Sequence, residues 1–330
     1  MQTANRTISP AFVRLLHDYV QSLGLDAWRV LGEARPAESP EQAVGFPMAH
    51  WVELLRRASQ HMDDPLLGLR IGQTIEPRHL GTLGFLLQSL PTLGAAMQKL
   101  QRYQRLVYDQ TPMLQLVEAD YVDLVWGIDQ GQPGSLADDT SITALIYYCR
   151  AIAAGPVIPQ YVQFVNPAPR NCAAYRAAYG CPVEFTAPVT RVRFSSATLA
   201  LPLRAANADL STLMERQTEQ LLALWPTPDE PFVAHIRTAI GALLHDGEPT
   251  LPRVAERLAV TPRTAQRHLQ QAGTSFRTEL ETVRRQMAEI YLRDARLSVA
   301  DIALLLGYSE HSALTRSYRQ WTGQAPRPRR

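Results

Sequence analysis

The side chains best suited to specific chemistry lie in two short stretches near the carboxyl end of the sequence. Within each stretch, polar residues recur at steps of three and four, which places them on one face of a helix. Arg and Gln can each form two hydrogen bonds to the edge of one base, and Ser and Thr bond to bases or phosphates. The residues are Arg263, Thr264, Gln266, Arg267 and Gln270, followed by His311, Ser312, Thr315, Arg316 and Arg319.

The charge distribution indicates the same kind of partner. Residues 249–330 contain 14 Arg and no Lys against seven acidic residues, an excess of seven positive charges. Since the whole chain carries a formal net charge of only +2, the first 248 residues are acidic overall. A basic module behind an acidic body is typical of a protein that binds nucleic acid at one end.

Two repeated patterns would position these polar side chains. Residues 251–271 and 299–320 each predict a short helix, a three-residue turn and a second helix. Each first helix has a central alanine, Ala255 or Ala303, whose small side chain lets the two helices cross closely. This is the pattern of a helix-turn-helix, whose second helix enters the major groove.

The turns of both patterns carry their own signals. Gly307 suits a turn position with positive φ. Thr261 and Ser309 stand where a hydroxyl would accept hydrogen bonds from the first turn of the second helix. Pro262 follows at the first helical position, which proline favours.

A long helix is predicted between the two patterns. Residues 275–294 place apolar side chains at steps of three and four without interruption. Twenty helical residues rise about 30 Å, close to the roughly 34 Å between successive major grooves on one face of DNA. One rigid helix would therefore hold two recognition helices in adjacent grooves.

The rest of the chain predicts a mainly helical fold with one α+β segment. Helical patterns dominate residues 1–110, beginning with Ser9 as a cap. Residues 111–200 alternate strands and helices in the order β-β-α-β-α-β-β, which indicates one sheet packed by helices. Helices are expected over 10–20, 25–31, 47–61, 65–71, 81–94, 93–108, 136–153, 169–179 and 209–224, and strands over 113–118, 121–129, 161–165, 183–185 and 191–194.

These patterns predict two domains. Residues 1–224 would form an α+β effector-binding and dimerisation domain, with Leu210, Leu213, Met214, Leu221 and Leu224 along a helix that could pair with a second copy or pack on its own domain. The proline-rich residues 225–231 would form a stiff linker. Residues 232–330 would form an all-α domain with tandem helix-turn-helix motifs.

The C-terminal hundred residues resemble the DNA-binding domain of the AraC/XylS family of bacterial transcription regulators. The resemblance is strongest over residues 297–326, LSVADIALLLGYSEHSALTRSYRQWTGQAP, and Arg284 and Ala288 fit an R-x-x-x-A pattern in the connecting helix. The segments DPLLGLRIGQ, GTLGFLLQSLPTLGAAMQKLQRYQRL and YGCPVEF resemble the arabinose-binding-like effector domain of the subfamily with ornithine- and arginine-responsive regulators.

The family resemblance implies which residues contact bases. Its base-contacting positions fall on Arg263, Gln266 and Arg267 in the first motif, and on His311, Ser312 and Arg316 in the second. The chain departs from the family in the first motif, where Ala259 replaces the usual turn glycine and Ala265 a usual leucine. We expect both departures to loosen that motif.

The function implied is a sequence-specific transcription regulator that binds promoter DNA, acts as a homodimer, contacts RNA polymerase if it is an activator, and responds to an amino acid or related metabolite. Aromatic candidates for the effector pocket are Phe85, Tyr103, Trp126 and Tyr147, although residues of this kind more often belong to the core than to the wall of a ligand site. The alternatives are a DNA-repair methyltransferase of the Ada type and an effector-independent architectural DNA binder. The large α+β body argues against the architectural protein.

An enzyme is not expected. The sequence contains no nucleophile elbow, zincin, P-loop or dinucleotide motif, and no cofactor is predicted. Cys149, Cys172 and Cys181 form no C-x-x-C pair and supply too few ligands for the four-cysteine zinc site of an Ada-type enzyme, so no metal is predicted. Their odd number and the lack of a signal-peptide pattern at the N-terminus favour a reducing, cytoplasmic location.

Overall fold

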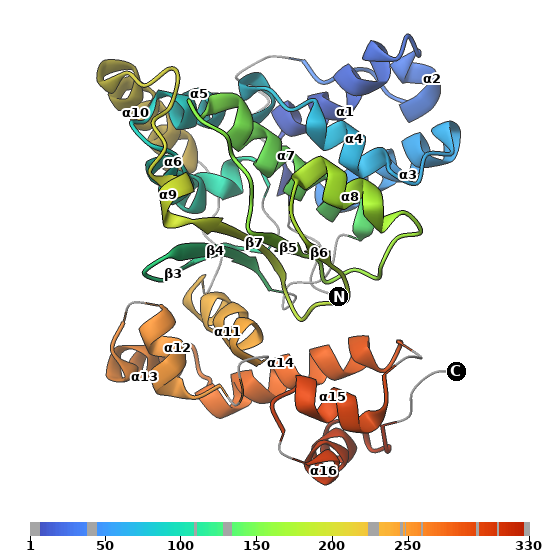
Figure 1. Cartoon of the computed structure of the whole chain (residues 1–330), viewed down its shortest axis with the longest axis vertical. Coiled ribbons are helices and arrows are strands. Elements are labelled where there is room, and N and C mark those ends of the chain that lie inside the picture. The colour runs from blue at the N-terminus through green and yellow to red at the C-terminus, as the bar shows by residue number, and fades with distance from the viewer. Residues whose placement is uncertain are drawn as a thin grey trace.

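The chain forms three layers, with N-terminal helices on one side of a β-sheet and C-terminal helices on the other (Figure 1). The computed structural model describes residues 7–37, 45–108, 111–127, 134–223, 231–244, 247, 249–258, 260–294, 297–308 and 310–326. The mainly helical fold with one α+β segment, predicted from the sequence, is confirmed.

The N-terminal layer is helical, and side chains cap several of its helices. Ser9 Oγ accepts a hydrogen bond of 3.0 Å from Phe12 N, and Thr92 Oγ1 accepts one of 3.2 Å from Ala95 N. The helices are α1 (Pro10–Ser22), α2 (Ala27–Leu31), α3 (Met48–Met62), α4 (Leu67–Gln73), η1 (Pro77–Leu80), α5 (Thr82–Ser89), α6 (Leu93–Tyr103), η2 (Gln104–Leu106), α7 (Ser135–Ile152), α8 (Cys172–Tyr179), α9 (Ser196–Leu199) and α10 (Ala208–Ala223).

The central sheet has five strands in the order β3-β4-β7-β5-β6. All neighbours are antiparallel except β5 and β6, which are parallel. The strands are β3 (Met113–Val117), β4 (Tyr121–Trp126), β5 (Tyr161–Gln163), β6 (Val183–Glu184) and β7 (Thr190–Ser195). A separate two-stranded sheet, which the sequence did not predict, joins β1 (Thr7–Ile8) to β2 (Phe46–Pro47).

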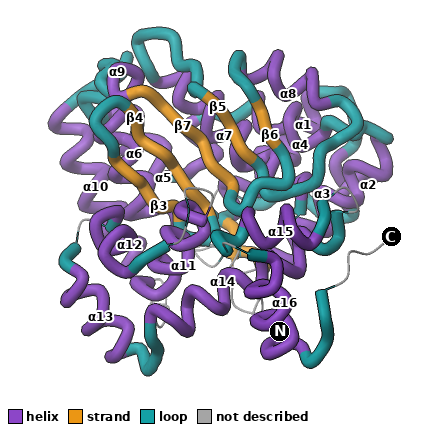
Figure 2. The backbone as a smooth tube through the Cα atoms, turned by 60° about the horizontal axis from the view of Figure 1, so that its bottom comes forward, coloured by secondary structure: helices purple, strands orange, loops and turns teal. Residues whose placement is uncertain are grey.

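The two faces of the five-stranded sheet have different partners because side chains alternate along each strand. Val122, Leu124, Val192 and Phe194 point to the face that α5, α6, α7 and α8 cover, and they belong to the N-terminal hydrophobic core. The opposite face carries apolar side chains on β3 and at Val125 of β4, and polar side chains at Asp123 of β4 and on β5, β6 and β7. This opposite face is turned toward the C-terminal helices (Figure 2).

The C-terminal layer contains two helix pairs joined by a longer helix. Its helices are α11 (Pro231–Leu243), α12 (Leu251–Arg257), α13 (Pro262–Gln271), α14 (Phe276–Tyr291), α15 (Val299–Leu305) and α16 (His311–Thr322). In both tube and ribbon views, α13 and α16 lie near opposite ends of α14. The predicted connecting helix over 275–294 is shorter than expected: α14 has 16 residues, a rise of about 24 Å, because the chain turns after Tyr291.

Helix α11 packs the C-terminal layer against the sheet. Leu114, Leu116 and Val125 of the sheet share one hydrophobic core with Val233, Ile236 and Ile240 of α11. Gly241 permits the close approach, since a Cβ at this position would lie 3.0 Å from Val189 Cγ1. An ion pair of 2.7 Å between Arg257 Nη1 and Glu118 Oε1 adds a polar link at the same interface.

Helix α10 packs on its own part of the chain. Met214 contributes to the N-terminal core, and Glu219 accepts a hydrogen bond of 2.6 Å from the Tyr103 hydroxyl. Lys99 also pairs with Glu215 of α10. Leu210 and Leu213 are exposed, while Leu224 lies outside the described residues, as does nearly all of the predicted linker 225–231. Pairing with a second copy through α10 therefore remains a prediction.

Candidate DNA-binding surface and ligand cavities

Helix α13 presents a polar face opposite a buried one. Thr261 caps the helix by accepting a hydrogen bond of 3.1 Å from Thr264 N. Ala265 and Leu269 are buried in the C-terminal core, on the side of α13 that meets α11 and α12, as predicted. The opposite face carries Arg263, Gln266, Arg267 and Gln270, all exposed, with Thr264 half-buried at its edge.

Helix α16 has the same division. Leu314 is buried, and Tyr318 and Trp321 pack against the same core. The outward face carries His311, Arg316 and Arg319, which are exposed, and Ser312 and Thr315, which are half-buried. The Ser312 hydroxyl donates a hydrogen bond of 3.0 Å to Glu310, and the Thr315 hydroxyl donates one of 3.0 Å to the His311 carbonyl. The predicted cap, Ser309, lies outside the described residues.

The Arg side chains of α13 and α16 differ in their ion pairing from those of α14, the helix between them. On α14, Arg277 pairs with Glu281 at 3.1 Å and Arg285 with Glu289 at 3.3 Å. Over the described ranges, no ion pair involves the four cations of the outer helices, which are Arg263, Arg267, Arg316 and Arg319. Because their charges are not neutralised internally, they are available to phosphates and base edges.

Both helix-turn-helix turns contain the same hydrogen bond. Tyr308 N donates to Ala303 O at 2.9 Å, and Val260 N donates to Ala255 O at 3.0 Å. In the second turn this bond completes a Schellman motif around Gly307, whose φ of 69° confirms the predicted left-handed conformation. Ala255 and Ala303 are buried at the helix crossings, as expected, whereas Ala259 lies outside the described residues.

Arg284 stabilises the second turn from α14. Its buried guanidinium donates hydrogen bonds to the carbonyls of Leu306 at 3.0 Å and Gly307 at 3.2 Å. It also lies over the Tyr308 ring, 4.2 Å from the centroid. The Arg of the R-x-x-x-A pattern is thus a positioning residue for the second motif and lies away from the outward face.

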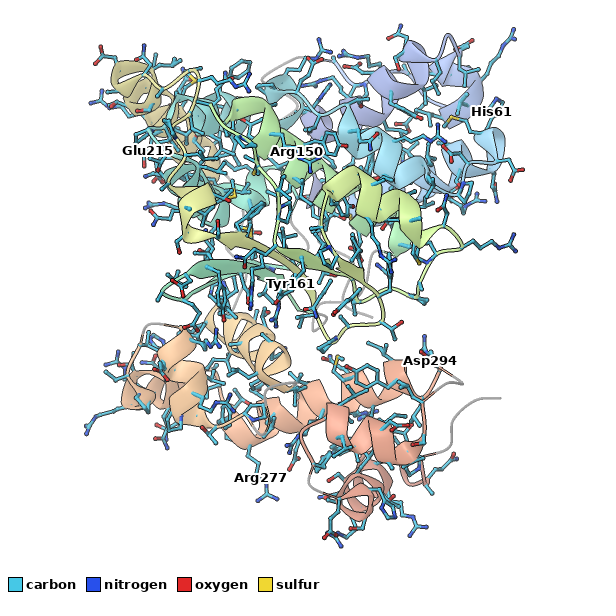
Figure 3. All side chains as sticks on the ribbon, in the orientation of Figure 1. His61, Arg150, Tyr161, Glu215, Arg277 and Asp294 are labelled. Atoms are coloured by element: carbon cyan, nitrogen blue, oxygen red, sulfur yellow. The ribbon has the colours of Figure 1, made fainter. Side chains whose placement is uncertain are left out.

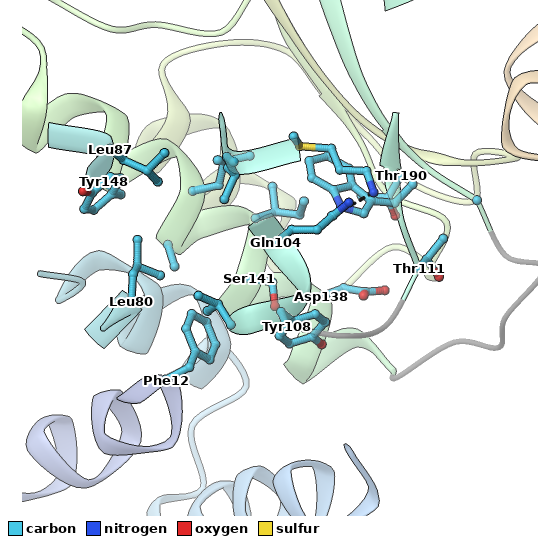
Figure 4. A pocket seen from close by; sticks show the side chains of 18 of the residues that line it. Phe12, Leu80, Leu87, Gln104, Tyr108, Thr111, Asp138, Ser141, Tyr148 and Thr190 are labelled. Carbon is cyan, nitrogen blue, oxygen red and sulfur yellow. Dashed lines mark hydrogen bonds between the residues drawn. The ribbon is translucent and has the colours of Figure 1, made fainter. Parts of the chain in front are cut away.

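A first cavity of about 130 Å³ lies between the sheet and the N-terminal helices (Figure 4). Most of its lining is apolar, with Phe12, Leu87 and Trp126 on different walls. Its described lining includes one carboxylate, Asp138, and no basic residue. The polar side chains around it are Gln104, Tyr108, Thr111, Asp138, Ser141 and Thr190.

One end of the first cavity is polar. Burial raises the pKa of Asp138 to about 7, against the opposing effect of a hydrogen bond from Asn166. Burial likewise raises the pKa of its neighbour Asp139 to about 7, although Tyr175 donates a hydrogen bond to it at 2.6 Å. The buried hydroxyl of Tyr108 forms no hydrogen bond of normal geometry to any described residue. This end could bind one donor group of a ligand.

The four aromatic candidates for the effector pocket do not come together. Trp126 lines the first cavity. Tyr103 is buried beside it and bonded to Glu219, whereas Phe85 is exposed on α5. The Tyr147 hydroxyl donates a hydrogen bond of 3.3 Å to the Ala178 carbonyl, outside the described lining of the cavity.

A second cavity of about 500 Å³ lies on the opposite face of the sheet, against α11 and α12. Figure 3 marks Tyr161 on this face, between the strands and the C-terminal helices. Its lining includes three guanidiniums and two carboxylates, and no sequence pattern predicts this cavity. Thr190 lines the first cavity and the next residue, Arg191, lines the second, so a single strand separates them.

The thiols of Cys149 and Cys181 are not activated as nucleophiles. Burial raises the pKa of Cys149 to about 12 and that of Cys181 to about 11. In the described ranges, no three His, Cys, Asp or Glu side chains are grouped as a metal site requires. No helix among the described residues has both the length and the hydrophobicity to span a membrane.

Comparisons with known families match both parts of the chain. The model of the arabinose-binding domain of AraC transcription regulators, an N-terminal domain, matches residues 24–203, more than half of the chain. A helix-turn-helix domain model matches residues 254–330, which include α13, α14, α15 and α16.

Individual relatives match over nearly the full length. The ornithine utilization regulator of Pseudomonas aeruginosa is 28% identical over 96% of this chain and 94% of its own length. The HTH-type transcriptional regulator VirS of Mycobacterium tuberculosis is 27% identical over 94% of this chain and 92% of its own. The crystal structure of transcriptional regulator CdpR from P. aeruginosa aligns over 95% of both chains, with 23% identity and a TM-score of 0.45.

Proposed function

We propose a division of labour within this chain, which belongs to the AraC family of DNA-binding transcription regulators. Helices α13 and α16 read promoter DNA, and the N-terminal part senses a small molecule. The observation that carries this proposal is the placement of four Arg side chains, none with an ion pair to another described residue, on two helices near the ends of α14. The proposed boundary between the two domains is the proline-rich segment 225–231.

The first recognition helix is proposed to read bases through Arg263, Gln266 and Arg267. Arg can bond both acceptors of guanine, and Gln can bond adenine in the same two-point way. In the second helix, His311, Ser312 and Arg316 take this role. Thr264, Gln270, Thr315 and Arg319 would contact phosphates at the groove edges and fix the register.

The first cavity is proposed as the sensor site. Its volume of about 130 Å³ is close to that of engineered apolar cavities that bind benzene-sized molecules. Because Asp138 and Tyr108 form its polar end, the ligand that fits is compact, mainly apolar and ends in one amine or hydroxyl. Ligand occupancy would favour one of two arrangements of the C-terminal helices.

A complete amino acid fits the first cavity poorly. Ornithine, which the name of one relative suggests, carries two ammonium groups and a carboxylate. The described lining contains no cation to pair with that carboxylate, and burying an unpaired charge is costly. This favours an amine or alcohol over the amino acid expected from the family resemblance.

The proposal also covers the absence of repair chemistry at two cysteines, the cellular location and the protein partners. The raised thiol pKa values of Cys149 and Cys181 support a regulator over an alkyl-transferring repair enzyme, which needs a reactive thiolate. We further propose that the protein acts in the cytoplasm as a homodimer and contacts RNA polymerase when it activates transcription.

Two measurements on the full chain test the proposal. In an electrophoretic mobility shift with DNA from upstream of the protein's own gene, we expect specific binding that weakens steeply as salt rises. In a thermal-shift assay, n-butylamine or n-butanol should raise the Tm, with the amine effect lost in Asp138→Asn. The matched diamine 1,4-diaminobutane should not raise it, because its second ammonium finds no second carboxylate in the described lining. No specific DNA binding, or stabilisation by 1,4-diaminobutane alone, would overturn the respective half of the proposal.

A further inference from the structure

We propose that the second cavity is a separate binding site for a small carboxylate-bearing molecule, held between the sheet and helices α11 and α12. The cavity of about 500 Å³ falls in the usual size range of small-molecule sites. It goes beyond the sensor function proposed above, because it uses different residues, the other face of the sheet and a ligand of opposite charge.

The floor of this cavity is rigid. Asp123 is almost completely buried and accepts two hydrogen bonds of 2.7 Å from Arg193, in a two-point ion pair. The Arg193 guanidinium also lies 3.5 Å from the Tyr121 ring centroid and 4.7 Å from that of Tyr161. Arg193 is therefore held by an anion in its plane and by rings on its faces, and it stabilises the site without being free to bind a ligand.

Arg191 is bonded much less completely than Arg193. Its side chain is only 11% exposed, yet its contacts with Asp123 Oδ2 and the Tyr161 hydroxyl are 3.4 and 3.3 Å long. Its Nε is buried without a hydrogen-bond partner in the described part of the chain. Since Arg193 already satisfies Asp123, the charge of Arg191 is in excess, and a buried cation with incomplete partners favours a bound anion.

Carboxylate is the anion that fits a guanidinium best, since its two oxygens match the planar donors. The rim supplies further polar groups: Gln163 Nε2 donates a hydrogen bond of 2.7 Å to Glu184 Oε2, and both side chains line the cavity. The exposed carboxylate of Glu184 would disfavour a second anionic group there and accept a cationic or hydroxyl group of the same ligand.

The C-terminal helices supply the roof of the site. Ala242 and Leu243 at the end of α11, and Arg257 of α12, line the cavity. Arg191 Nη2 already donates a hydrogen bond of 3.2 Å to the Ala242 carbonyl, so the same guanidinium touches both parts of the chain. A ligand bound at Arg191 would therefore contact the sheet and the C-terminal helices at once.

The test uses the full-length chain in a buffer free of carboxylates and phosphate. Succinate, glutarate, citrate and L-glutamate are titrated by calorimetry and thermal shift, with 1,5-pentanediol as the uncharged counterpart of glutarate. We expect at least one carboxylate to bind and raise the Tm by a few degrees, and pentanediol to have no effect. Arg191→Gln should weaken that binding about tenfold or more, the loss of one charge-assisted hydrogen-bonding group.

Three variants make the result decisive. Glu184→Gln, at the exposed rim, should bind succinate and glutarate as tightly as the unaltered chain or more tightly, and should bind L-glutamate more weakly because its ammonium loses a partner. Asp138→Asn should lose the amine response of the first cavity and keep the carboxylate response, which separates this proposal from the sensor proposal. Should Arg191→Gln fold poorly by circular dichroism, Arg191→Lys retains the charge without the planar donors and should bind several-fold more weakly. The proposal is overturned when no carboxylate binds, or when all the Arg191 variants that fold bind it unchanged.

Discussion

The guanidinium of Arg284 donates a hydrogen bond of 3.2 Å to the carbonyl oxygen of Gly307, in the turn of the second helix-turn-helix. Gly307 stands at the C-terminal end of α15 with a φ of 69°, and a Cβ there would lie 3.2 Å from the Gly247 carbonyl. Arg284 therefore fixes a backbone turn from the middle of α14. The turn that leads into α16 thus depends on this buried cation of α14 for two of its hydrogen bonds.

Replacing Arg284 tests that dependence. Arg284→Met keeps an unbranched apolar stem and leaves the carbonyls of Leu306 and Gly307 without their donor, so we expect a loss of about 2–4 kcal/mol in unfolding free energy. Urea unfolding measures it. The neighbouring Arg285→Met is the control: Arg285 is exposed and paired only with Glu289, so its loss should change stability by less than about 1 kcal/mol. Equal effects of the two substitutions would contradict the assigned role.

The two recognition helices should make separable contributions to sequence reading. Arg267→Ala and Arg316→Ala should each cost about 1–3 kcal/mol on a specific site and relax preference at different base positions. Fluorescence anisotropy against a set of single-base operator variants measures both effects. Arg29→Ala, which removes an exposed cation from α2, should leave affinity unchanged. A uniform loss on specific and random DNA would assign Arg267 and Arg316 to phosphate contacts instead.

The first turn should gain stability from glycine. Ala259 occupies the position that Gly307 holds in the second motif, and a left-handed conformation costs a residue with a Cβ roughly 1–2 kcal/mol. Glycine also frees the unfolded chain, which offsets part of the gain. We expect Ala259→Gly to raise the stability of residues 228–330 by up to about 1 kcal/mol, a few degrees in Tm, with DNA binding unchanged. A clear fall in Tm would mean that the first turn differs from the second.

The two buried carboxyls beside the first cavity predict a pH dependence of unusual sign. The pKa of Asp138 and that of Asp139 are both raised from 3.8 to about 7, so the folded chain keeps protons that the unfolded chain has lost. The stability that these groups contribute is fully present below about pH 4. It falls by at most about 1.4 kcal/mol per pH unit for each group as the pH rises toward 7, and then levels off.

Asp138→Asn removes one of these two groups and isolates its effect. Relative to the Tm of the unaltered chain, the Tm of the variant should be lowest near pH 4.5. It should rise on that relative scale as the pH increases to 7.5. Differential scanning calorimetry across this range measures it. A difference that stays constant with pH would show that Asp138 titrates at its ordinary pKa in the folded chain.

Local sequence signals predicted most of the helices and their caps. Ser9 and Thr261 cap helices because a hydroxyl before an apolar periodic run satisfies nearby backbone donors. Ala265 and Leu269 are buried because they fall on one helical face. These features depend on residues only a few positions apart, which is why one sequence was enough to find them.

The cavities depend on pairings across long stretches of sequence. Strand β4 pairs with β7, with Asp123 opposite Arg193, although 69 residues separate these two in the chain. Asp138 reaches the first cavity from α7, and Arg257 reaches the second from α12. Aromatic type alone was a poor guide to the lining, since Phe85 is exposed and only Trp126 of the four aromatic candidates lines the first cavity.

The thinness of the sheet has a thermodynamic consequence. Thr190 and Arg191 face opposite cavities from adjacent positions of one strand, so a shift of β7 that suits one occupant alters the walls around the other. If an amine in the first cavity changes the affinity for a carboxylate in the second, the carboxylate must change the affinity for the amine by the same factor. The state of the protein on DNA would then depend on both concentrations together: on their ratio if the two ligands oppose each other, and on their joint presence if each favours the other.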